Sequence, residues 1–221
     1  MKNENIITFS RDSSLKIWKI NNNNQGGINC LKTLDDGRLA AKDDYSNLII
    51  YNKETFNPEI TIKNNLSNLY NFAQLKNKNI ACSFWSDRTL KIIKINNNNY
   101  EYIQTIKNAH NAEIGQIIEL KNENIITFSR DYSFNIWKLN NNNQYEKINE
   151  FKDTNGLSDG LEIKDNEIIL YTLYTNPQSL VFFNLNENKK IKTLNNLKFN
   201  GHACICKINK INDNEVVVAG N

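Results

Sequence analysis

The sequence lacks the long apolar segments that carry a chain into or through a membrane. No window approaches the apolar length that crosses a bilayer. The amino-terminal residues, MKNENIITFS, hold no basic stretch followed by a long apolar run, which a secretory signal requires. We therefore expect a cytoplasmic protein with no membrane insertion.

Histidine and closely spaced cysteine, the usual material of metal sites, are also scarce. The chain has 2 His, and its 4 Cys (Cys30, Cys82, Cys204 and Cys206) form no C-x-x-C pair. The C-x-C at 204–206 would put both thiols on one face of a strand, but no second ligand pair accompanies it. We expect reduced thiols, no metal site and no cofactor.

A large excess of charge of one sign is absent as well. Lys and Arg number 27 and Asp and Glu 24, so the net charge is +3. This balance argues against a nucleic-acid partner, which selects a strongly basic surface. Of the few arginines, Arg11 and Arg130 occupy the same place in a repeat.

That repeat is the clearest feature of the sequence. Residues 121–144, KNENIITFSRDYSFNIWKLNNNNQ, match residues 2–25, KNENIITFSRDSSLKIWKINNNNQ, at 20 of 24 positions. Each copy predicts a strand, a tight polar turn around an Asp, a second strand that ends on Trp, and an Asn tract. The Asn tracts at 21–24, 96–99 and 140–143 are interpreted as solvent-exposed turns, because Asn tolerates left-handed backbone geometry.

Looser copies fill the rest of the chain. Each has an aromatic or aliphatic anchor at the Trp position, and these anchors lie 33, 42, 44 and 46 residues apart: Trp18, Tyr51, Ile93, Trp137 and Phe183. A period of about 40 to 45 residues with several short strands per unit is typical of β-propeller blades. The predicted units are 2–25, 28–63, 66–107, 110–152, 157–195 and a partial one at 201–221, in a single domain spanning 1–221.

The first strand of each later unit carries apolar residues three apart, as in Ile28/Leu31/Leu34 and Leu69/Phe72/Leu75. Taken alone, this spacing suggests a helix. We predict strands instead, because the runs are short, rich in Ile, and followed at once by turn residues and another β-branched run.

The fourth unit holds His110 ahead of its first strand, then Thr127 and Ser129, then Asp131, and closes on Trp137. This order resembles the WD-repeat β-propeller family, over nearly the whole chain. Lys138 replaces the usual Asp after the Trp, and most other units lack the His. The resemblance implies an all-β propeller, here of about five blades plus a partial one. Because the chain stops before a sixth Asp turn, we expect an open or truncated ring; the alternative is a ring closed by pairing of 203–211 with the amino-terminal strands. It also implies a structural network around Asp131 and His110, with counterparts at Asp12, Trp18, Asp87 and His202.

In that family the residue just before the turn Asp often faces partners. Carried over, this places Arg11, Arg130, Ser86 and Asp43 or Asp44 on a docking face. Tyr132, Phe84 and Trp85 are candidate exposed anchors, since aromatic residues and Arg dominate interface energetics. Trp85 is equally suited to filling a gap between blades.

We therefore expect a non-catalytic scaffold that binds a protein or peptide. One rival is a hydrolase-type propeller with a site in its central channel, which would need clustered inward acids or metal ligands. Another is a phosphate- or phosphoinositide-binding propeller, which would need paired basic residues on its loops. A catalytic role for His110, Asp131 and Ser129 is disfavoured, because the trio repeats as a unit without a G-x-S-x-G elbow.

Overall fold

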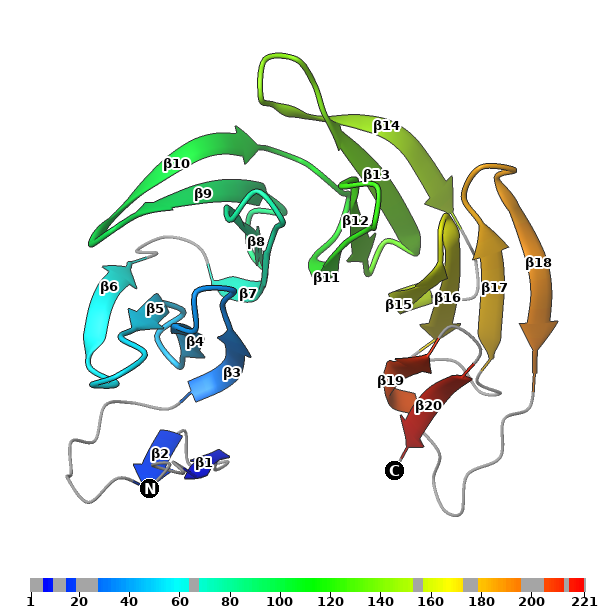
Figure 1. Ribbon diagram of the computed structural model, residues 1–221. Helices are drawn as coiled ribbons and strands as arrows, with labels where there is room; N and C mark the ends of the chain where they lie inside the picture. The colour runs from blue at the N-terminus through cyan, green and yellow to red at the C-terminus, as the bar shows by residue number, and fades with distance from the viewer. Residues whose placement is uncertain are drawn as a thin grey trace.

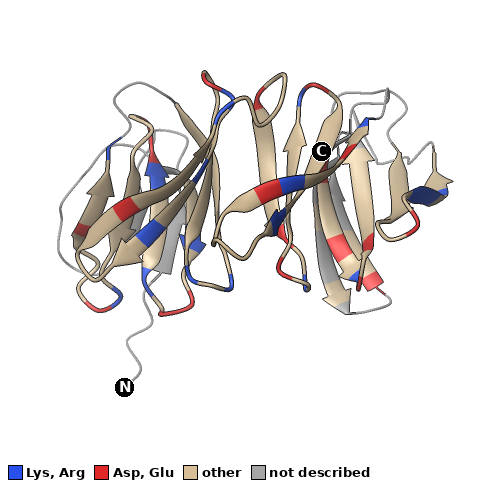
Figure 2. Ribbon diagram, turned by 90° about the horizontal axis from the view of Figure 1, so that it is seen from above, with Lys and Arg blue, Asp and Glu red and all other residues tan. Residues whose placement is uncertain are grey.

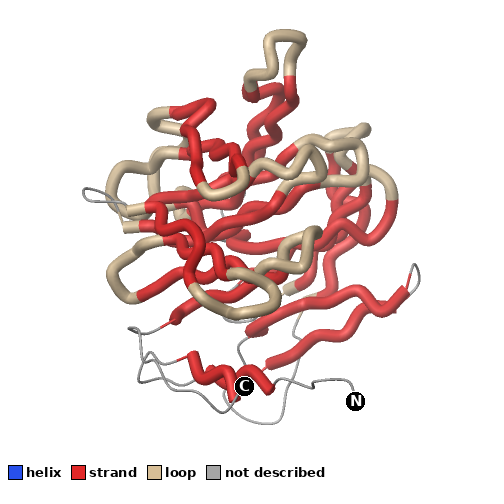
Figure 3. Tube along the Cα trace, turned by 60° about the vertical axis from the view of Figure 1, so that its left-hand side comes forward, coloured by secondary structure: helices blue, strands red, loops and turns tan. Residues whose placement is uncertain are grey.

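The computed structural model describes residues 6–9, 15–18, 28–63, 68–152, 157–172, 179–195, 205–212 and 215–220. Every regular element in these ranges is a β-strand, as Figure 3 shows. The all-β prediction is therefore confirmed for the described part of the chain.

The strands form six antiparallel sheets, numbered here in chain order. Sheet 1 is β1 (Ile6–Phe9) and β2 (Leu15–Trp18). Sheet 2 is β3 (Ile28–Thr33), β4 (Leu39–Asp43), β5 (Leu48–Tyr51) and β6 (Pro58–Ile62). Sheet 3 is β7 (Leu69–Gln74), β8 (Ile80–Phe84), β9 (Leu90–Asn96) and β10 (Asn99–Ile106). Sheet 4 is β11 (Ile114–Glu119), β12 (Ile125–Ser129), β13 (Ser133–Leu139) and β14 (Tyr145–Lys152). Sheet 5 is β15 (Leu157–Lys164), β16 (Glu167–Thr172), β17 (Leu180–Asn184) and β18 (Lys189–Leu194). Sheet 6 is β19 (Ile205–Asn212) and β20 (Glu215–Gly220).

The sheets follow one another along an arc (Figure 1). In each four-stranded sheet the chain runs from an inner first strand to an outer fourth strand, and every neighbouring pair is hydrogen-bonded in sequence order. Among the described residues no strand pairing joins sheet 1 to sheet 6, so no closed ring is seen. The four complete sheets correspond to the predicted units 28–63, 66–107, 110–152 and 157–195.

A β-bulge recurs near the start of the inner strand. One extra residue stands between paired positions in five sheets, at Asn29, Tyr70, Gly115, Ser158 and Cys206. A bulge inserts one residue and so shifts the alternation of side chains by one. This shift explains why Leu69 and Phe72, or Ile114 and Ile117, share a face at a spacing of three. The strand prediction for these segments is confirmed.

The core lies between the sheets rather than inside one. Phe72, Phe84 and Ile93 of sheet 3 pack against Leu48 and Ile62 of sheet 2. The opposite face of sheet 3 packs against sheet 4, and the far face of sheet 4 packs against sheet 5. Because both faces are covered, the second strands β8 and β12 are buried along their whole length.

One hydrogen bond recurs at three successive sheet boundaries. The Gln74 Oε1 atom accepts the amide of Asp35 at 2.8 Å, Glu119 Oε2 accepts the amide of Lys76 at 2.7 Å, and Glu162 Oε2 accepts that of Lys121 at 2.7 Å. Gln74 and Glu119 end the inner strands of their sheets, and Glu162 lies two residues before the end of β15. Each donor lies in the first turn of the sheet before it. We call this contact the boundary hydrogen bond. It satisfies a turn amide and fixes the spacing of neighbouring sheets.

Lys and Arg are interspersed with Asp and Glu along the strands and turns (Figure 2). Two of the predicted Asn-tract turns lie within the described residues, at 96–99 and 140–143. Asn97 and Asn143 are exposed and have φ of 44° and 57°, as the turn interpretation requires. The tract at 21–24 lies outside the described residues.

Candidate functional site: a cation–aromatic row on the Asp-turn face

The turns between the second and third strands define one face of the arc. We call it the Asp-turn face; its described turns are 44–47, 85–89 and 130–132. The connection from sheet 3 to sheet 4, which carries His110, lies at the same end of the strands. The remaining turns lie on the opposite face, because consecutive antiparallel strands reverse direction.

In sheet 4 a buried hydrogen-bond network supports this face. Trp137 Nε1 donates to Thr127 Oγ1 at 2.8 Å, and Thr127 Oγ1 lies 2.7 Å from His110 Nε2. On the other side of the ring, His110 Nδ1 lies 2.9 Å from Ser133 Oγ, which donates to Asp131 Oδ1. A neutral imidazole protonated on Nδ1 satisfies the whole series, since each hydroxyl then donates once and accepts once.

Asp131 is the acceptor at the end of this series. Its Oδ2 also accepts the Asn111 amide at 2.7 Å, and its Oδ1 accepts the Ser133 amide at 2.9 Å. Burial favours the neutral acid, but the His110 ring, whose Nδ1 lies 3.5 Å from Oδ2, and the hydrogen bonds from Ser133 and Asn111 outweigh it and hold the pKa of Asp131 well below its usual range. The carboxylate therefore ties the turn to the connection between sheets 3 and 4.

Beyond the turn, two residues hold equivalent positions on neighbouring sheets. The Arg130 amide donates to Glu113 O at 3.0 Å, and the Trp85 amide donates to Asn68 O at 2.8 Å. Each directly follows a second strand and bonds to the residue just before the inner strand. The counterpart in sheet 2 is Asp44, which directly follows β4.

Arg130 and Trp85 meet across the sheet boundary. The Arg130 guanidinium carbon lies 4.5 Å from the Trp85 ring centroid. Behind Trp85 stands Tyr70, at the bulge of β7, with ring centroids 5.1 Å apart. Lys42 Nζ lies 5.8 Å from the Tyr70 ring, and desolvation lowers the pKa of this half-buried lysine. We call Lys42, Tyr70, Trp85 and Arg130 the cation–aromatic row; it spans sheets 2, 3 and 4.

The other predicted docking residues lie close to this row. Asp44, Ser86 and Tyr132 are exposed, and Tyr132 exposes 54% of its surface. The expectation that Phe84 is an exposed anchor is wrong: its exposure is 0%, because it is the last residue of a strand buried on both faces. Asp43 is likewise buried, and its carboxylate accepts from the amide and side chain of Asn47.

Several predicted residues lie outside these contacts. Arg11, Asp12 and His202 fall outside the described residues, and only the backbone of Trp18 is described, in β2. Ser129 is buried and its Oγ accepts the Asp131 amide at 3.2 Å, within the turn rather than at the imidazole. Asp87 accepts from the amide and hydroxyl of Thr89, at 3.1 and 2.6 Å.

Sequence reasoning missed Ser133, the hydroxyl that joins His110 to Asp131, and it missed Tyr70 and Lys42. A signal for Ser133 was present, because a Ser or Thr stands two residues after the turn Asp in Asp87–Thr89 and Asp131–Ser133. Tyr70 and Lys42 carry no such signal, since only the fold brings them together.

Comparison with known proteins adds no family: no family model matches the chain, and a search of curated proteins finds no significant match. No helix in the described part of the chain is long and apolar enough to cross a membrane. The described residues contain no group of three or more His, Cys, Asp or Glu side chains placed to hold a metal ion.

Proposed function

We propose that this chain is a non-catalytic, cytoplasmic scaffold of the WD-repeat propeller type, which binds a protein or peptide on the Asp-turn face. The observation that carries the proposal is the contact between Arg130 and Trp85 at equivalent positions of two neighbouring sheets. A partner lying along the whole cation–aromatic row would touch residues from three sheets at once.

The row suits recognition because its side chains are already ordered. Trp85 holds the Arg130 guanidinium over its ring, so less side-chain freedom is lost when a partner binds. The exposed Tyr132 beside Arg130 adds apolar area with a polar tip. Arg and aromatic residues together are the usual centre of a protein interface.

The buried hydrogen-bond network around His110 favours a structural role over a catalytic one. His110 has an exposure of 4%, and its two ring nitrogens face the hydroxyls of Thr127 and Ser133. A substrate would have to displace these buried partners to reach the imidazole. The same residues instead position the turn that presents Arg130.

A peptide-display selection against the folded chain tests the proposal. We expect selected peptides to lose about tenfold or more in affinity in Arg130→Glu and in Trp85→Ala, since central interface residues contribute at least 1–2 kcal/mol. The matched control is Lys138→Glu, which makes the same charge reversal at an exposed residue on β13. Circular dichroism and urea unfolding establish that each variant is folded. Peptides that bind both row variants as tightly as the wild type would refute the docking face.

A further inference from the structure

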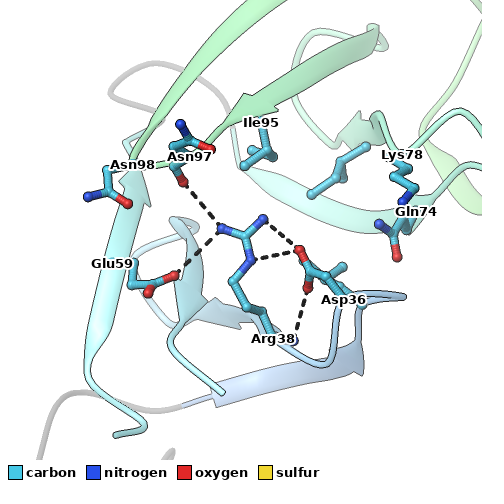
Figure 4. A pocket seen from close by; sticks show the side chains of 10 residues that line it. Asp36, Arg38, Glu59, Gln74, Lys78, Ile95, Asn97 and Asn98 are labelled. Carbon is cyan, nitrogen blue, oxygen red and sulfur yellow. Dashed lines mark hydrogen bonds and ion pairs between the residues drawn. The ribbon is translucent and has the colours of Figure 1, made fainter. Parts of the chain in front are cut away.

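A second candidate site lies on the face opposite the Asp-turns, between sheets 2 and 3 (Figure 4). It is a cavity of about 500 Å³ whose apolar wall is formed by Leu34, Ile80 and Ile95. This volume falls within the range of small-molecule sites, which combine apolar walls with a few polar groups. The equivalent place at the next boundary, between sheets 3 and 4, is filled by a side chain of sheet 4.

The three wall residues of the cavity have direct counterparts at that next boundary. The first turns of sheets 2 and 3 close with the same pair of backbone hydrogen bonds, and the second and third strands of sheets 3 and 4 share one register. These equivalences match Leu34 with Leu75, Ile80 with Ile125, and Ile95 with Leu139. The counterparts all belong to the core between sheets 3 and 4, and they pack there in one cluster with Tyr145.

At the cavity itself the corresponding tyrosine points elsewhere. Tyr145 is 5% exposed, and its hydroxyl accepts a hydrogen bond from Asn77 Nδ2 at 3.4 Å. Tyr100 holds the same position in sheet 3, since each pairs with the matching residue of the third strand. The Tyr100 ring is only partly buried, stands edge-on to Tyr102 with centroids 5.7 Å apart, and does not line the cavity. The space that a tyrosine ring fills at one boundary is therefore open at the other.

The polar end of the cavity differs from its counterpart in one residue. Asp36 stands where sheet 3 has Asn77, because each accepts the amide two residues later through Oδ1, at 3.0 and 3.1 Å. Arg38 donates to Asp36 Oδ2 through Nε at 2.9 Å and lies 3.6 Å from Glu59 (Figure 4). Desolvation favours the neutral form of Asp36, but the hydrogen bonds from Arg38 outweigh it and lower the pKa of Asp36. Asp36 is therefore an ionised acceptor, whereas Asn77 offers a donor.

The charges around the cavity balance. Its charged residues are two acids and two bases: Asp36, Glu59, Arg38 and Lys78. The lining as a whole therefore favours a ligand without net charge. The two acids and Arg38 form one group with an excess of negative charge, so the polar end of the cavity favours a ligand that donates a hydrogen bond.

We infer that this cavity binds a small neutral phenol. The ring lies on Leu34, Ile80 and Ile95, as Tyr145 packs among their counterparts, and the hydroxyl donates to the Asp36 carboxylate. A phenol keeps its proton at neutral pH, because its pKa is about 10. A hydrogen bond to an ionised acceptor is stronger than one to a neutral acceptor, so the hydroxyl proton sets the preference of the site. This site is separate from the cation–aromatic row and does not depend on it.

Two ligands that differ in the hydroxyl proton test the inference by NMR titration of the isotopically labelled chain. They are p-cresol, which is the tyrosine side chain without its backbone, and 4-methylanisole, in which a methyl group replaces the proton. For a ligand of this size in a partly open cavity we expect a Kd on the order of 1 mM for p-cresol. The ether should bind at least about fivefold more weakly, because it cannot donate to the carboxylate. The largest shifts should fall on the amides of Leu34, Ile80 and Ile95.

Asp36→Asn should remove the preference for p-cresol. An amide in this position can donate to a hydroxyl or to an ether oxygen, as Asn77 donates to Tyr145. The variant keeps the turn, since sheet 3 has Asn at the equivalent place. Asp35→Asn, the same change at a neighbouring residue that does not line the cavity, should bind both ligands like the wild type.

Filling the cavity from its wall tests whether the space is open. Ile95→Phe should bring the affinity for p-cresol below detection and leave the urea midpoint unchanged or raised. Leu139→Phe, the matched change at the filled boundary, should lower the midpoint, because an extra ring overpacks an occupied core. Equal affinity for the two ligands, shifts centred elsewhere, a preference that persists in Asp36→Asn, equal losses in the two Phe variants or the absence of binding would each overturn the inference.

Discussion

Sheets 3 and 4 have the same strands in the same register, but one pair of buried positions is hydrogen-bonded in sheet 4 and packed with apolar side chains in sheet 3. In sheet 4 that position contains Thr127 and Trp137, joined to each other and to His110 by hydrogen bonds. In sheet 3 the counterparts are Cys82 and Ile93, both with an exposure of 0% and both packed into the core shared with sheet 2. The pairing of Ile125 with Trp137 and of Ile80 with Ile93 establishes the equivalence.

The network of sheet 4 both caps the Asp turn and fills the interior of the sheet, whereas sheet 3 does these two things with separate residues. Sheet 3 keeps the turn hydrogen bonds from Thr89 to Asp87, as sheet 4 does from Ser133 to Asp131. It dispenses with the buried Thr and Trp and fills the space with apolar atoms. The hydrogen bonds that cap the turn can therefore form without a polar network in the interior of the sheet. A buried polar network is favourable only where every one of its members has a hydrogen-bond partner.

Removing the turn carboxylate should give the largest difference between the two sheets. Asp131→Ala leaves the Ser133 hydroxyl and the amides of Ser133 and Asn111 without their acceptor, and it removes the carboxylate that lies 3.5 Å from His110 Nδ1. It should lower the free energy of unfolding by about 3 kcal/mol. Asp87→Ala removes the acceptor of Thr89 and should cost about 1 kcal/mol. Urea unfolding measures both. Equal losses would mean that the two turns contribute alike and that the network adds nothing.

Exchanging the interior residues sharpens the same contrast. Thr127→Cys deprives Trp137 Nε1 and His110 Nε2 of a strong partner and should cost about 2 kcal/mol. The reciprocal Cys82→Thr buries a hydroxyl beside apolar side chains and should cost about 1–2 kcal/mol. Each substitution introduces the residue that the other sheet has at the equivalent position. If either left the free energy of unfolding unchanged, the neighbouring side chains would have to rearrange to accommodate it. Urea unfolding measures both changes, provided that the dependence of the unfolding free energy on urea concentration is the same for the variants and the wild type.

Lowering the pH should reduce the contribution of the sheet 4 network to the free energy of unfolding. The pKa of Asp131 is lowered on folding from the usual 3.8, so its stabilising contribution is present above that value. The contribution is lost as the pH falls from there towards the folded-state pKa. The stability gap between the wild type and Asp131→Asn should therefore be about 1–2 kcal/mol near neutral pH and should shrink below about pH 4. A gap that is independent of pH would contradict the ionised, hydrogen-bonded state.

The smallest effect should come from the contact that joins the two sheets on the surface. Arg130→Ala removes the cation from the Trp85 ring and should destabilise the fold by about 0.5–1 kcal/mol. It should also change the fluorescence of Trp85, whose ring face becomes exposed to solvent. Arg88→Ala, on the neighbouring turn, serves as the control. If both variants leave the emission unchanged, the stacking does not persist in solution.

Much of the fold follows from the sequence because its repeat is explicit. The spacing of the anchors predicted the four complete sheets, and the strand assignment survived a spacing of three that suggests helix. The reason for that spacing was not predictable, because a bulge such as that at Tyr70 depends on which residues pair across the strands.

The site was predicted in part. Counting back from the turn Asp gives Arg130 in sheet 4 but Ser86 in sheet 3, whereas the strand register puts Trp85 at the equivalent position. The turn of sheet 3 has one residue more between Ile80 and Asp87 than sheet 4 has between Ile125 and Asp131. Sequence alone does not reveal which residue is extra, and so the stacking of Arg130 on Trp85 required the structure.

The boundary hydrogen bond has a consequence for synthesis on the ribosome. Its acceptor always belongs to the later sheet: Gln74 completes a turn of sheet 2, Glu119 one of sheet 3 and Glu162 one of sheet 4. A newly synthesised unit therefore forms its boundary hydrogen bond only after the next unit has been made. At 5–20 residues per second, synthesis of a unit of about 40–45 residues takes on the order of seconds. The nascent array grows as a row of finished units behind a single unfinished one.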